Sequence, residues 1–499
     1  MRAYLPFMRS FFIKLAIGIA VLIVAVAGYV AYSQYAATSK LPLSDTEGRD
    51  PKLGKADPQT IPGVRLVETQ GWADGEAPIA AKGLAVSRFA EKLDHPRTML
   101  TLPNGDVLVA ETNAPAKSAM DGFTGMVAGW MMKKVGAGVP SPNKIVLLRD
   151  EDGDGRAEKR FDFRTDDMDS PSGMAFGDGR IYIANHDAVL AWNFEPGPTK
   201  LTGKPRRIMN LPEAGQHWMR NLLLSDDGKH LYVAVGSATN IADGGMEAEA
   251  GRAAIWEIDT DTGRRRQFAA GMRNPNGLGW SPWTGEMWAT VQERDMLGPD
   301  LVPDYFTNVP VGAQYGWPWV YWKNVFDDRV RWDMQTYMIE YTRKPEYAMG
   351  AHAGVLGMVF PAAGNRMGAA FANGAFIARH GSWNRNPAVG YDVVFVGFDA
   401  HGNPLDAKPV PVLTGFLTAD GKNTHGRPTW LAWDKTGGLL VSDDTAGIIW
   451  RVAAPDAKPA AAIRPVVTAH LKPLKEIKTP EERAMIGGFK PEDDRLLPQ

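Results

Sequence analysis

HPRTMLTLPNGDVLVAET, residues 95–112, holds the unit that decides the fold of this chain. A polar incoming loop leads into a short apolar strand, a turn centred on Gly105 and a second apolar strand, a pattern typical of a β-hairpin. Five further copies follow, each with a glycine that we expect at its turn. They span residues 170–187, 217–237, 273–295, 356–382 and 427–444, with turn glycines Gly179, Gly228, Gly285, Gly374 and Gly437.

Six copies of one two-strand unit predict an all-β fold, a six-bladed β-propeller in which every copy supplies the inner strands of one blade. A blade takes roughly 40–50 residues, so the longer first and fourth intervals between copies contain insertions. A β-sandwich with fortuitously similar strands is the alternative. Six repeats of the same unit favour the propeller over it.

The composition agrees with a large folded body, because 44% of the 499 residues are hydrophobic and only 22% are charged. The 53 glycines and 36 prolines suit many short strands joined by tight turns. A formal net charge of −2 argues against a nucleic-acid partner. The absence of cysteine excludes disulfides, thiolate metal sites and cysteine nucleophiles.

The N-terminus carries an uncharged apolar run from Leu15 to Ser33, preceded by a basic flank. This run is long enough to cross a bilayer as a helix. Because basic flanks stay on the inner side, we expect a transmembrane anchor with the body exported to the periplasm. A cleavable signal with its site at Ala31-Tyr32-Ser33 is the alternative. The basic residues are Arg2, Arg9 and Lys14.

The expected organisation has five parts and two notable insertions. An insertion around residues 120–139 predicts a helix that either packs on the propeller or faces a membrane or a partner. Another, residues 301–349, is rich in aromatic residues, and we expect it to roof or wall the mouth of the central channel. The five parts are a cytoplasmic basic flank at 1–14, an anchor or signal at 15–33, a tether at 34–60, the propeller at 61–455 and a tail at 456–499.

Propeller geometry predicts where function concentrates. The loop that enters the first strand of a blade and the loop that leaves its second strand lie on one face, around the mouth of the channel. These loops hold six of the nine histidines, together with arginines and carboxylates, and loops on a rigid scaffold commonly carry function. Arginine suits a polyanionic ligand, neutral histidine suits a base, and carboxylates suit Ca²⁺. The six histidines are His95, His186, His217, His352, His380 and His425.

Several of these segments resemble the soluble glucose dehydrogenase and sorbosone dehydrogenase family of pyrroloquinoline quinone (PQQ) enzymes, most of all its L-sorbosone dehydrogenase branch. The resemblance covers residues 85–453 and rests on RNPNGL with the acidic loop after it, YGWP, HGSWNR and GRPTWLAW. It implies a propeller with PQQ and Ca²⁺ at the mouth. The implied reaction oxidises a sugar aldehyde or aldose to the acid or lactone and passes electrons to a quinone or another acceptor.

The same resemblance implies roles for single residues. His217 would take the proton of the substrate hydroxyl. Arg273 and Asn274 would hold the cofactor and the substrate oxygen. Arg427 would pair with carboxylates of PQQ. For a second basic position in the outgoing loop of the fifth blade, the candidates are His380, Arg385 and Arg379.

The chain departs from the glucose enzymes at the loop that binds the cofactor Ca²⁺. Those enzymes carry a Gln-Gly-Pro turn whose backbone carbonyls bind the ion, whereas this chain reads Gln292-Glu293-Arg294-Asp295. The carboxylates of Glu293 and Asp295 could replace the carbonyls, since both are oxygen ligands. Arg294 beside them indicates a changed geometry, and Thr429 stands where the glucose enzymes have a second late arginine.

A second Ca²⁺ candidate is an acidic loop with oxygen ligands at positions 1, 3, 5 and 9 and Gly155 at position 6. An acidic hairpin turn between outer strands is the alternative interpretation of this loop. Two other functions stay open for the whole chain, a Ca²⁺-dependent lactonase or hydrolase and a non-catalytic ligand-binding propeller. The arginines of the mouth favour a polyanion such as PQQ over a lactone. The loop ligands are Asp150, Asp152, Asp154 and Glu158.

Overall fold

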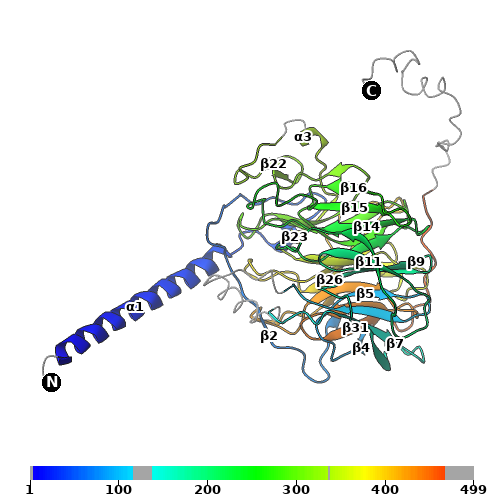
Figure 1. The fold of residues 1–499 in the computed structure, drawn as a ribbon, viewed down its shortest axis with the longest axis horizontal. Helices are drawn as coiled ribbons and strands as arrows, with labels where there is room; N and C mark the ends of the chain where they lie inside the picture. Colours follow the sequence, from blue (N-terminus) through cyan, green and yellow to red (C-terminus); the bar gives the residue numbers. More distant parts are fainter. Residues whose placement is uncertain (1–3, 116–137, 335–337, 467–499) are drawn as a thin grey trace, which may run out of the picture.

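The computed structural model describes residues 4–115, 138–334 and 338–466, and Figure 1 shows a body built almost wholly of β-strands. The strands form six main sheets of four or five strands each. The innermost strands of neighbouring sheets contact one another in a closed circle, so the sheets are the blades of one ring. The predicted six-bladed β-propeller is therefore confirmed. In circular order these inner strands are β5 (Pro96–Thr101), β9 (Gly173–Gly177), β13 (Leu222–Leu224), β17 (Asn274–Trp280), β24 (Val355–Val359) and β29 (Pro428–Trp433).

Each blade continues outward from its inner strand, mainly by antiparallel pairing. Blade one adds β6 (Val107–Glu111), β7 (Lys144–Arg149) and β8 (Lys159–Arg164). Blade two adds β10 (Arg180–Ala184), β11 (Ala188–Asn193) and β12 (Arg206–Asn210). Blade three adds β14 (His230–Val235), β15 (Ala254–Asp259), β16 (Arg265–Ala270) and β20 (Ala313–Gln314).

The remaining blades include strands from the N-terminal part of the chain. Blade four adds β18 (Met287–Gln292), β19 (Pro303–Asn308), β23 (Tyr347–Ala351) and β1 (Glu47–Gly48). Blade five adds β25 (Gly374–Arg379), β26 (Asp392–Gly397), β27 (Val410–Thr414) and β3 (Ile79–Ala80). Blade six adds β30 (Leu439–Asp443), β31 (Ile448–Ala453) and β4 (Ala85–Ala90).

Short elements complete the description. The helices are α1 (Tyr4–Ala36), α3 (Met338–Tyr341), η1 (Leu43–Thr46) and η3 (Ala369–Phe371). Two small sheets stand outside the blades, β2 (Glu68–Thr69) with β28 (Asn423–Thr424) and β21 (Val320–Tyr321) with β22 (Val325–Phe326). The helix predicted around residues 120–139 falls almost wholly on positions outside the described residues.

The ring is closed by a strand that the repeat pattern does not contain. β4 precedes blade one in sequence but pairs antiparallel with β31 in blade six, with Ile449 opposite Ala90 and Ala453 opposite Ala85. β4 thereby becomes the outermost strand of blade six, and because the chain continues from it into blade one, it ties the last blade to the first. The N-terminal part of the chain therefore completes the last blade.

Hydrogen bonds and close backbone approaches hold adjacent blades together around the channel. The amide of Arg220 donates to the hydroxyl of Ser172 at 2.7 Å between blades two and three, and the hydroxyl of Ser442 donates to the carbonyl of Arg97 at 2.6 Å between blades six and one. A Cβ on Gly277 would lie 2.6 Å from the carbonyl oxygen of Leu356, so only glycine permits this approach of blades four and five. The RNPNGL segment thus serves packing as well as the site.

Five of the six predicted turn glycines lie in positive-φ conformations at hairpin turns, for example Gly105 with φ of 94° and Gly437 with φ of 90°. The sixth prediction is wrong, because Gly374 is the first residue of β25. Residues 360–373, with η3, make a long connection there instead of a tight turn. The pattern recognised the two strands but placed their turn too late.

Strand register places the incoming and outgoing loops of each blade at the same end. Pro96 is opposite Glu111, Asn274 is opposite Gln292, and Pro428 is opposite Asp443. We call this end of the propeller the mouth face. The other end, with the hairpin turn after β5 and the loop between β7 and β8, is the opposite face.

The segment expected as a tether, residues 34–60, does not hang free of the body. Its backbone bonds to the blade-five and blade-four loops of the mouth face, as when the amide of Ser39 donates to the carbonyl of Asn386 at 2.8 Å and that of Gln59 to Met296 at 3.0 Å. Glu47 forms a buried ion pair with Arg379. Polar, proline-containing sequence here indicates an extended strap, because the hydrogen bonds of its backbone are made by the propeller loops.

The insertion at residues 301–349 lies against the mouth face, as expected. Trp317 donates its indole N–H to the carbonyl of Asn240 at 3.0 Å, and Arg329 donates to the carbonyl of Asp295 at 2.9 Å. The buried guanidinium of Arg294 donates to the carbonyls of Pro318 and Val320 at 2.6 and 2.8 Å. The Glu293–Asp295 loop and the aromatic insertion at residues 301–349 therefore form one connected wall of the mouth.

Candidate active site

Two carboxylates, Asp295 and Asp444, organise the polar residues of the mouth face. Asp444 is buried and Asp295 is partly buried, and each collects arginine and histidine side chains from several blades. The outgoing loop of blade five reaches both, through His380 to Asp444 and through Asn384 to Asp295. We call the two sets the Asp295 group and the Asp444 group.

The Asp295 group joins blades three, four and five. Arg273 donates to the carboxylate at 3.0 Å and Asn384 at 2.9 Å, while His352 Nδ1 lies 3.4 Å away. The side chain of Asn240 accepts the amide N–H of Asp295 at 2.9 Å. Although burial opposes ionisation, Arg273 and His352 lower the pKa of Asp295 well below its usual value. Asp295 is therefore a fixed negative charge.

His217 lies beside this group and has a defined tautomer. Its Nδ1 is 2.9 Å from the carbonyl oxygen of Ser237 and 3.0 Å from the Ser237 hydroxyl, which itself donates to the carbonyl of Thr239 at 2.7 Å. A carbonyl oxygen only accepts hydrogen bonds, so Nδ1 carries the proton. Nε2 is then the unprotonated nitrogen, with a lone pair available to accept a proton.

Electrostatics keep this imidazole neutral. Burial, followed by the charge of Arg273, lowers the pKa of His217 to about 3. Gly236 packs between His217 and Asn274, since a Cβ there would lie 2.6 Å from His217 Cβ and 2.4 Å from Asn274 Oδ1. The geometry thus brings His217, Arg273 and Asn274 together, as the sequence predicts.

The Asp444 group joins blades one, five and six. Arg97 donates to the carboxylate at 2.7 Å, His380 Nε2 lies 3.0 Å from it, and His95 Nε2 lies 3.8 Å from it. Burial opposes ionisation, but His380 and Arg97 lower the pKa of Asp444 far below its usual value. The guanidinium of Arg97 also lies over the ring of Trp218, 5.5 Å from its centroid.

Arg427 stands next to the Asp444 group. Its guanidinium donates to the hydroxyl of Tyr391 at 3.2 Å and lies 5.1 Å from the centre of that ring. Its amide donates to Asp443 at 2.8 Å, and the indole of Trp72 donates to the same carboxylate at 2.9 Å. Burial raises the pKa of Asp443 to about 6. Only the backbone amide of Arg427 contacts a carboxylate in these hydrogen bonds, whereas its guanidinium bonds to the Tyr391 hydroxyl; among the described residues the guanidinium forms no ion pair.

Unused donors indicate what this face can bind. Nε of Arg97 and Nε of Arg427 are buried, and neither has a hydrogen-bond partner among the described residues. Buried donors without partners are costly unless a ligand satisfies them. Two such guanidiniums beside His380 fit a ligand that carries several carboxylates, because arginine binds carboxylates in a bidentate manner. The residues present therefore fit the tricarboxylate PQQ.

Arg385 takes a different place from the one the resemblance implies. It forms an ion pair with Asp300 at 2.9 Å and donates to the carbonyls of Pro299 and Leu41, both at 2.6 Å. Its side chain is only 1% exposed. Arg385 thus fastens the N-terminal strap to the mouth face, and of the candidates only His380 joins the Asp444 group. Arg379 is likewise taken up by Glu47 and Asp392.

Glu293 and Asp295 do not share a ligand position. The carboxylate of Glu293 accepts the Nε–H of Arg294 at 3.0 Å, whereas that of Asp295 accepts from Arg273 and Asn384. The changed geometry predicted at Arg294 is this hydrogen bond, which holds the Glu293 carboxylate on Arg294 and away from Asp295. Asp295 alone of the two faces the residues around His217.

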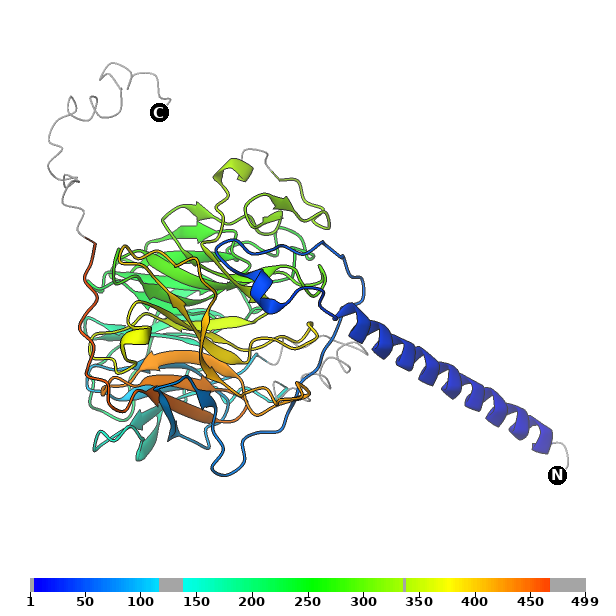
Figure 2. The ribbon, with the colours of Figure 1, turned by 180° about the vertical axis from the view of Figure 1, so that it is seen from behind.

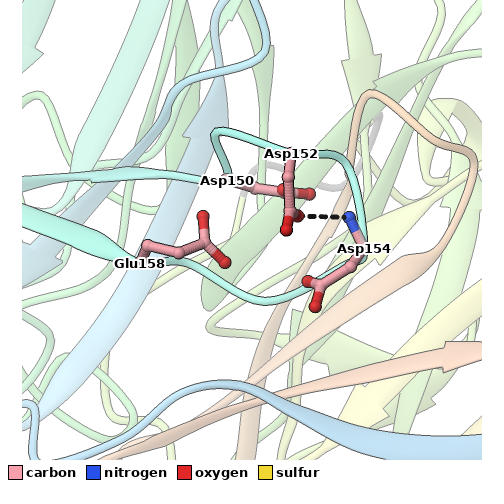
Figure 3. Close-up of side chains that lie close together, drawn as sticks. All are labelled: Asp150, Asp152, Asp154 and Glu158. Carbon is pink, nitrogen blue, oxygen red and sulfur yellow. Dashed lines mark hydrogen bonds between the residues drawn. The ribbon is translucent and has the colours of Figure 1, made fainter.

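The acidic loop between β7 and β8 lies on the opposite face, and Figure 3 shows its four carboxylates close together. Its four carboxylates offer oxygen atoms within 4.8 Å of one another, the one such group found among the described residues. Backbone amides also occupy them, for example Gly153 donating to Asp150 at 2.6 Å and Asp154 to Asp152 at 3.0 Å. This set is separate from the mouth, so a cation there would serve structure. The carboxylates belong to Asp150, Asp152, Asp154 and Glu158.

Sequence reasoning missed two contributors, Asn384 and Trp218. Asn384 bonds to Asp295, and Trp218 packs under Arg97. Trp218 directly follows His217, and Asn384 lies within the HGSWNR segment. Their position in incoming or outgoing loops is the signal that could have found them.

The six-bladed ring and the arginines and histidines of the mouth face agree with one class of oxidoreductase, the PQQ-dependent sugar dehydrogenases. Within it the chain belongs to the TrAA12-like family, whose family model matches residues 143–303 and 327–454, more than half of the chain. The predicted PQQ-dependent sugar dehydrogenase family, and with it an oxidoreductase, is confirmed. The L-sorbosone dehydrogenase branch stays a prediction.

Curated relatives match part of the chain. A PQQ-dependent pyranose dehydrogenase from Coprinopsis cinerea is 25% identical over 340 residues, which cover 56% of this chain and 46% of that protein. The chain thus spans about half the length of that relative. An uncharacterized protein from Borreliella burgdorferi is 27% identical over 304 residues, 57% of this chain and 76% of that protein.

Solved structures share the fold. The holo PQQ domain of the Coprinopsis cinerea pyranose dehydrogenase has a TM-score of 0.59 at 19% identity, covering 78% of this chain and 100% of that chain. A calcium structure of a Trichoderma reesei carbohydrate-active enzyme of family AA12 has a TM-score of 0.62 at 19% identity, covering 78% and 99%. Both agree with the six-bladed ring.

Proposed function

We propose that this protein uses PQQ to oxidise an aldose or a sugar aldehyde, glucose-like or sorbosone-like, to the lactone or acid, and passes the electrons to a quinone-type acceptor. One observation carries the proposal. The mouth places a neutral imidazole with a free Nε2, on His217, beside Arg273 and on the same face as the partnerless donors of Arg97 and Arg427. The pyranose dehydrogenase relative is named for the same cofactor and for sugar oxidation.

Arg273 of the Asp295 group, with His217 and Asn274 beside it, supplies binding and proton transfer. PQQ, when bound, supplies the hydride acceptor. Nε2 of His217 takes the proton of the substrate hydroxyl, and the Ser237 carbonyl holds Nδ1–H so that Nε2 keeps its orientation. Arg273, fixed by Asp295 at 3.0 Å, presents its guanidinium to the substrate oxygen. Asn274, next to Gly236, assists on the cofactor side.

The Asp444 group holds the carboxylates of the cofactor. Arg97 donates one N–H to Asp444, and its Nε has no partner among the described residues. Arg427 lies over the ring of Tyr391, and its Nε likewise has no partner there. His380 lies between them on Asp444. Asp444 offsets the charge of Arg97, whereas the guanidinium of Arg427 bonds to the hydroxyl of Tyr391 and stays available to a carboxylate of the cofactor.

We propose Ca²⁺ as the companion of PQQ, with the carboxylate of Asp295 as its nearest protein ligand. A hard cation accepts carboxylate and carbonyl oxygens, and both are present in the Glu293–Asp295 loop. The cation would polarise the quinone carbonyl as a Lewis acid. The acidic loop at Asp150 is proposed as a second, structural Ca²⁺ site. For the lactonase alternative, the one group found among the described residues whose carboxylate or imidazole ligand atoms all lie within 4.8 Å of one another is the Asp150 loop, away from the mouth.

We propose that α1 is an uncleaved membrane anchor and that the propeller lies in the periplasm. Within α1, the stretch Phe12–Ala36 contains an 18-residue window with mean hydropathy of 2.4, and it is long enough to cross a bilayer. Ser33, the last residue of the candidate cleavage site, is 4% exposed, and its carbonyl accepts the amide of Val64 at 3.2 Å. Cleavage after Ser33 would remove this buried contact, which supports retention of the helix.

Reconstitution tests the proposal. The purified full-length protein is loaded with PQQ and Ca²⁺, and reduction of a water-soluble dye is followed with glucose, other aldoses and sorbosone. We expect sugar-dependent dye reduction that needs both PQQ and Ca²⁺ and that EGTA abolishes when added before loading. Absence of dye reduction with every sugar, in protein that binds PQQ, would overturn the proposed reaction. Dye reduction that is indifferent to EGTA would overturn the role of Ca²⁺.

A further inference from the structure

The end of the apolar helix is joined directly to the rim of the mouth. Residues 37–39 and Asn386, in the outgoing loop of blade five, exchange backbone hydrogen bonds, with Asn386 donating to Ala37 at 2.7 Å and Ser39 donating to Asn386 at 2.8 Å. Gln59 caps the helix end by donating to the carbonyl of Ala36 at 2.9 Å. The helix therefore leaves the body from the mouth face.

The views of the whole molecule agree with this placement. Figures 1 and 2 show α1 projecting from one side of the propeller, whereas residues 454–466 lie along the other side. Those C-terminal residues bond to the opposite face, for example Ala460 donating to Asn365 at 2.9 Å and Val466 donating to Trp283 at 2.8 Å. The mouth and the membrane anchor are on the same side of the body.

The length of the helix leaves no spacer between the bilayer and the body. A hydrocarbon core takes about 20 helical residues, and the uncharged apolar part of α1 begins at Leu15, directly after Lys14. About 20 residues from Leu15 end next to Ser33, which is already buried against Pro62 and Val64. The rim of the mouth is therefore held at the level of the lipid headgroups.

The rim that would meet the headgroups carries exposed apolar side chains. They lie on elements that bond to the helix end or to the outgoing loops of the mouth: Arg65 donates to the carbonyl of Trp383 at 2.8 Å, and Asn113 donates to that of Val139 at 2.8 Å. Tryptophan and tyrosine favour the interface between lipid and water. This rim patch consists of Tyr35 at 76% exposure, Ile61 at 42%, Val139 at 45% and Trp383 at 40%.

We infer that the mouth of the propeller faces the membrane, that the rim patch contacts lipid, and that the electron acceptor is a quinone dissolved in the bilayer. The inference about the acceptor rests on the proposed function. At the mouth, such a quinone takes two electrons and two protons from the reduced cofactor and leaves as the quinol.

Site-specific labelling tests the orientation without any need for activity. The chain has no cysteine, so one introduced cysteine gives one labelled position. Trp383→Cys places a fluorophore in the rim patch, and Leu405→Cys, at a residue of 45% exposure on the opposite face, is the matched control. The full-length protein is placed in phosphatidylcholine–phosphatidylglycerol nanodiscs that contain spin-labelled lipid.

We expect strong quenching of the label at position 383 by the spin-labelled lipid and almost none at position 405. Ile61→Cys serves as a second rim probe if the Trp383 variant fails to fold. Equal quenching at rim and control positions would overturn the orientation. Removal of α1 from the mature protein, seen as a mass that lacks residues up to Ser33, would also overturn it.

Kinetics in the same nanodiscs test the acceptor. Trp383→Ser should lower the reduction rate of a bilayer-dissolved quinone severalfold and leave reduction of a water-soluble dye unchanged, whereas Leu405→Ser should change neither rate. An equal fall of both rates, or no fall of either, would overturn the inference. If the wild-type protein reduces no dye at all, the proposed function fails, while the labelling result still decides the orientation.

Discussion

Replacement of His217 tests the chemistry of the site most directly. His217→Gln keeps a side-chain amide that can donate to the Ser237 carbonyl, now 2.9 Å from Nδ1, but removes the basic Nε2. A positioned general base contributes about 10²–10⁴ in rate, which corresponds to about 3–5 kcal/mol at 1.36 kcal/mol per factor of ten. We therefore expect the turnover number for sugar to fall by at least about 10², with PQQ affinity unchanged.

The assay is dye reduction at saturating sugar, with PQQ binding followed separately by absorbance. Ser237→Ala is the matched control, because it removes only the hydroxyl and leaves the carbonyl that holds Nδ1. Its turnover should fall by less than about tenfold, the cost of one neutral hydrogen bond.

The pH profile gives an independent check on His217. Burial and Arg273 lower its pKa to about 3, so the neutral base is present throughout the range above about pH 4. Turnover of the Gln variant within threefold of the wild type would refute the base role. An acid limb near pH 6.5 that disappears in the variant would refute the lowered pKa.

Three further predictions follow from the buried charges and the acidic loop. Asp444→Asn leaves Arg97 buried without its carboxylate, so the free energy of unfolding should fall by about 3–5 kcal/mol and the melting temperature by several degrees. Asp420→Asn, at an exposed carboxylate, should change neither quantity. An unchanged melting temperature of Asp444→Asn contradicts this prediction. Burial lowers the pKa of His95 to about 4, below an unfolded value of about 6.5, so the unfolded state binds more protons between these pH values and stability rises with pH there. Urea unfolding at pH 5 and 7.5 should show a loss of about 2 kcal/mol at the lower pH that His95→Gln removes, and an identical pH dependence in both proteins would count against it. If the Asp150 loop between β7 and β8 holds Ca²⁺, EGTA should lower the melting temperature of the wild type but not that of Asp150→Asn. Dye turnover of this variant should be unchanged at saturating PQQ and Ca²⁺.

Local sequence pattern was sufficient for the inner part of the fold and not for its closure. The hairpin at residues 95–112 shows apolar strands and a turn within one stretch, so the blades could be counted. The strand β4 could not be assigned in this way, because its partner β31 lies at the far end of the chain and ring closure alone selects it. The strap at residues 34–60 has the composition of a linker, and only the propeller loops supply its hydrogen bonds.

In the site, too, some residues could be placed from the local sequence pattern and others could not. His217, Arg273 and Asn274 could be placed together because strand register brings incoming and outgoing loops to one face. The role of Arg385 could not, since its partners, Asp300 and the carbonyl of Leu41, come from another blade and from the strap. A motif shows which residue types are present, but the ion pair that each one forms depends on segments distant in sequence.

The pairing of β4 with β31 also sets the order in which this protein can become a folded molecule. Ala90 and Ile449 are partners, so the ring closes only after almost the whole propeller sequence has been synthesised. Contacts of such sequence separation are slow to form, because the loop entropy must be spent before the contact rewards it. Until then the backbone groups of β4 that pair with β31 have no partner in the sheet. The two strands belong to one chain, so their pairing is intramolecular, and the length of chain between them sets the effective concentration at which they meet.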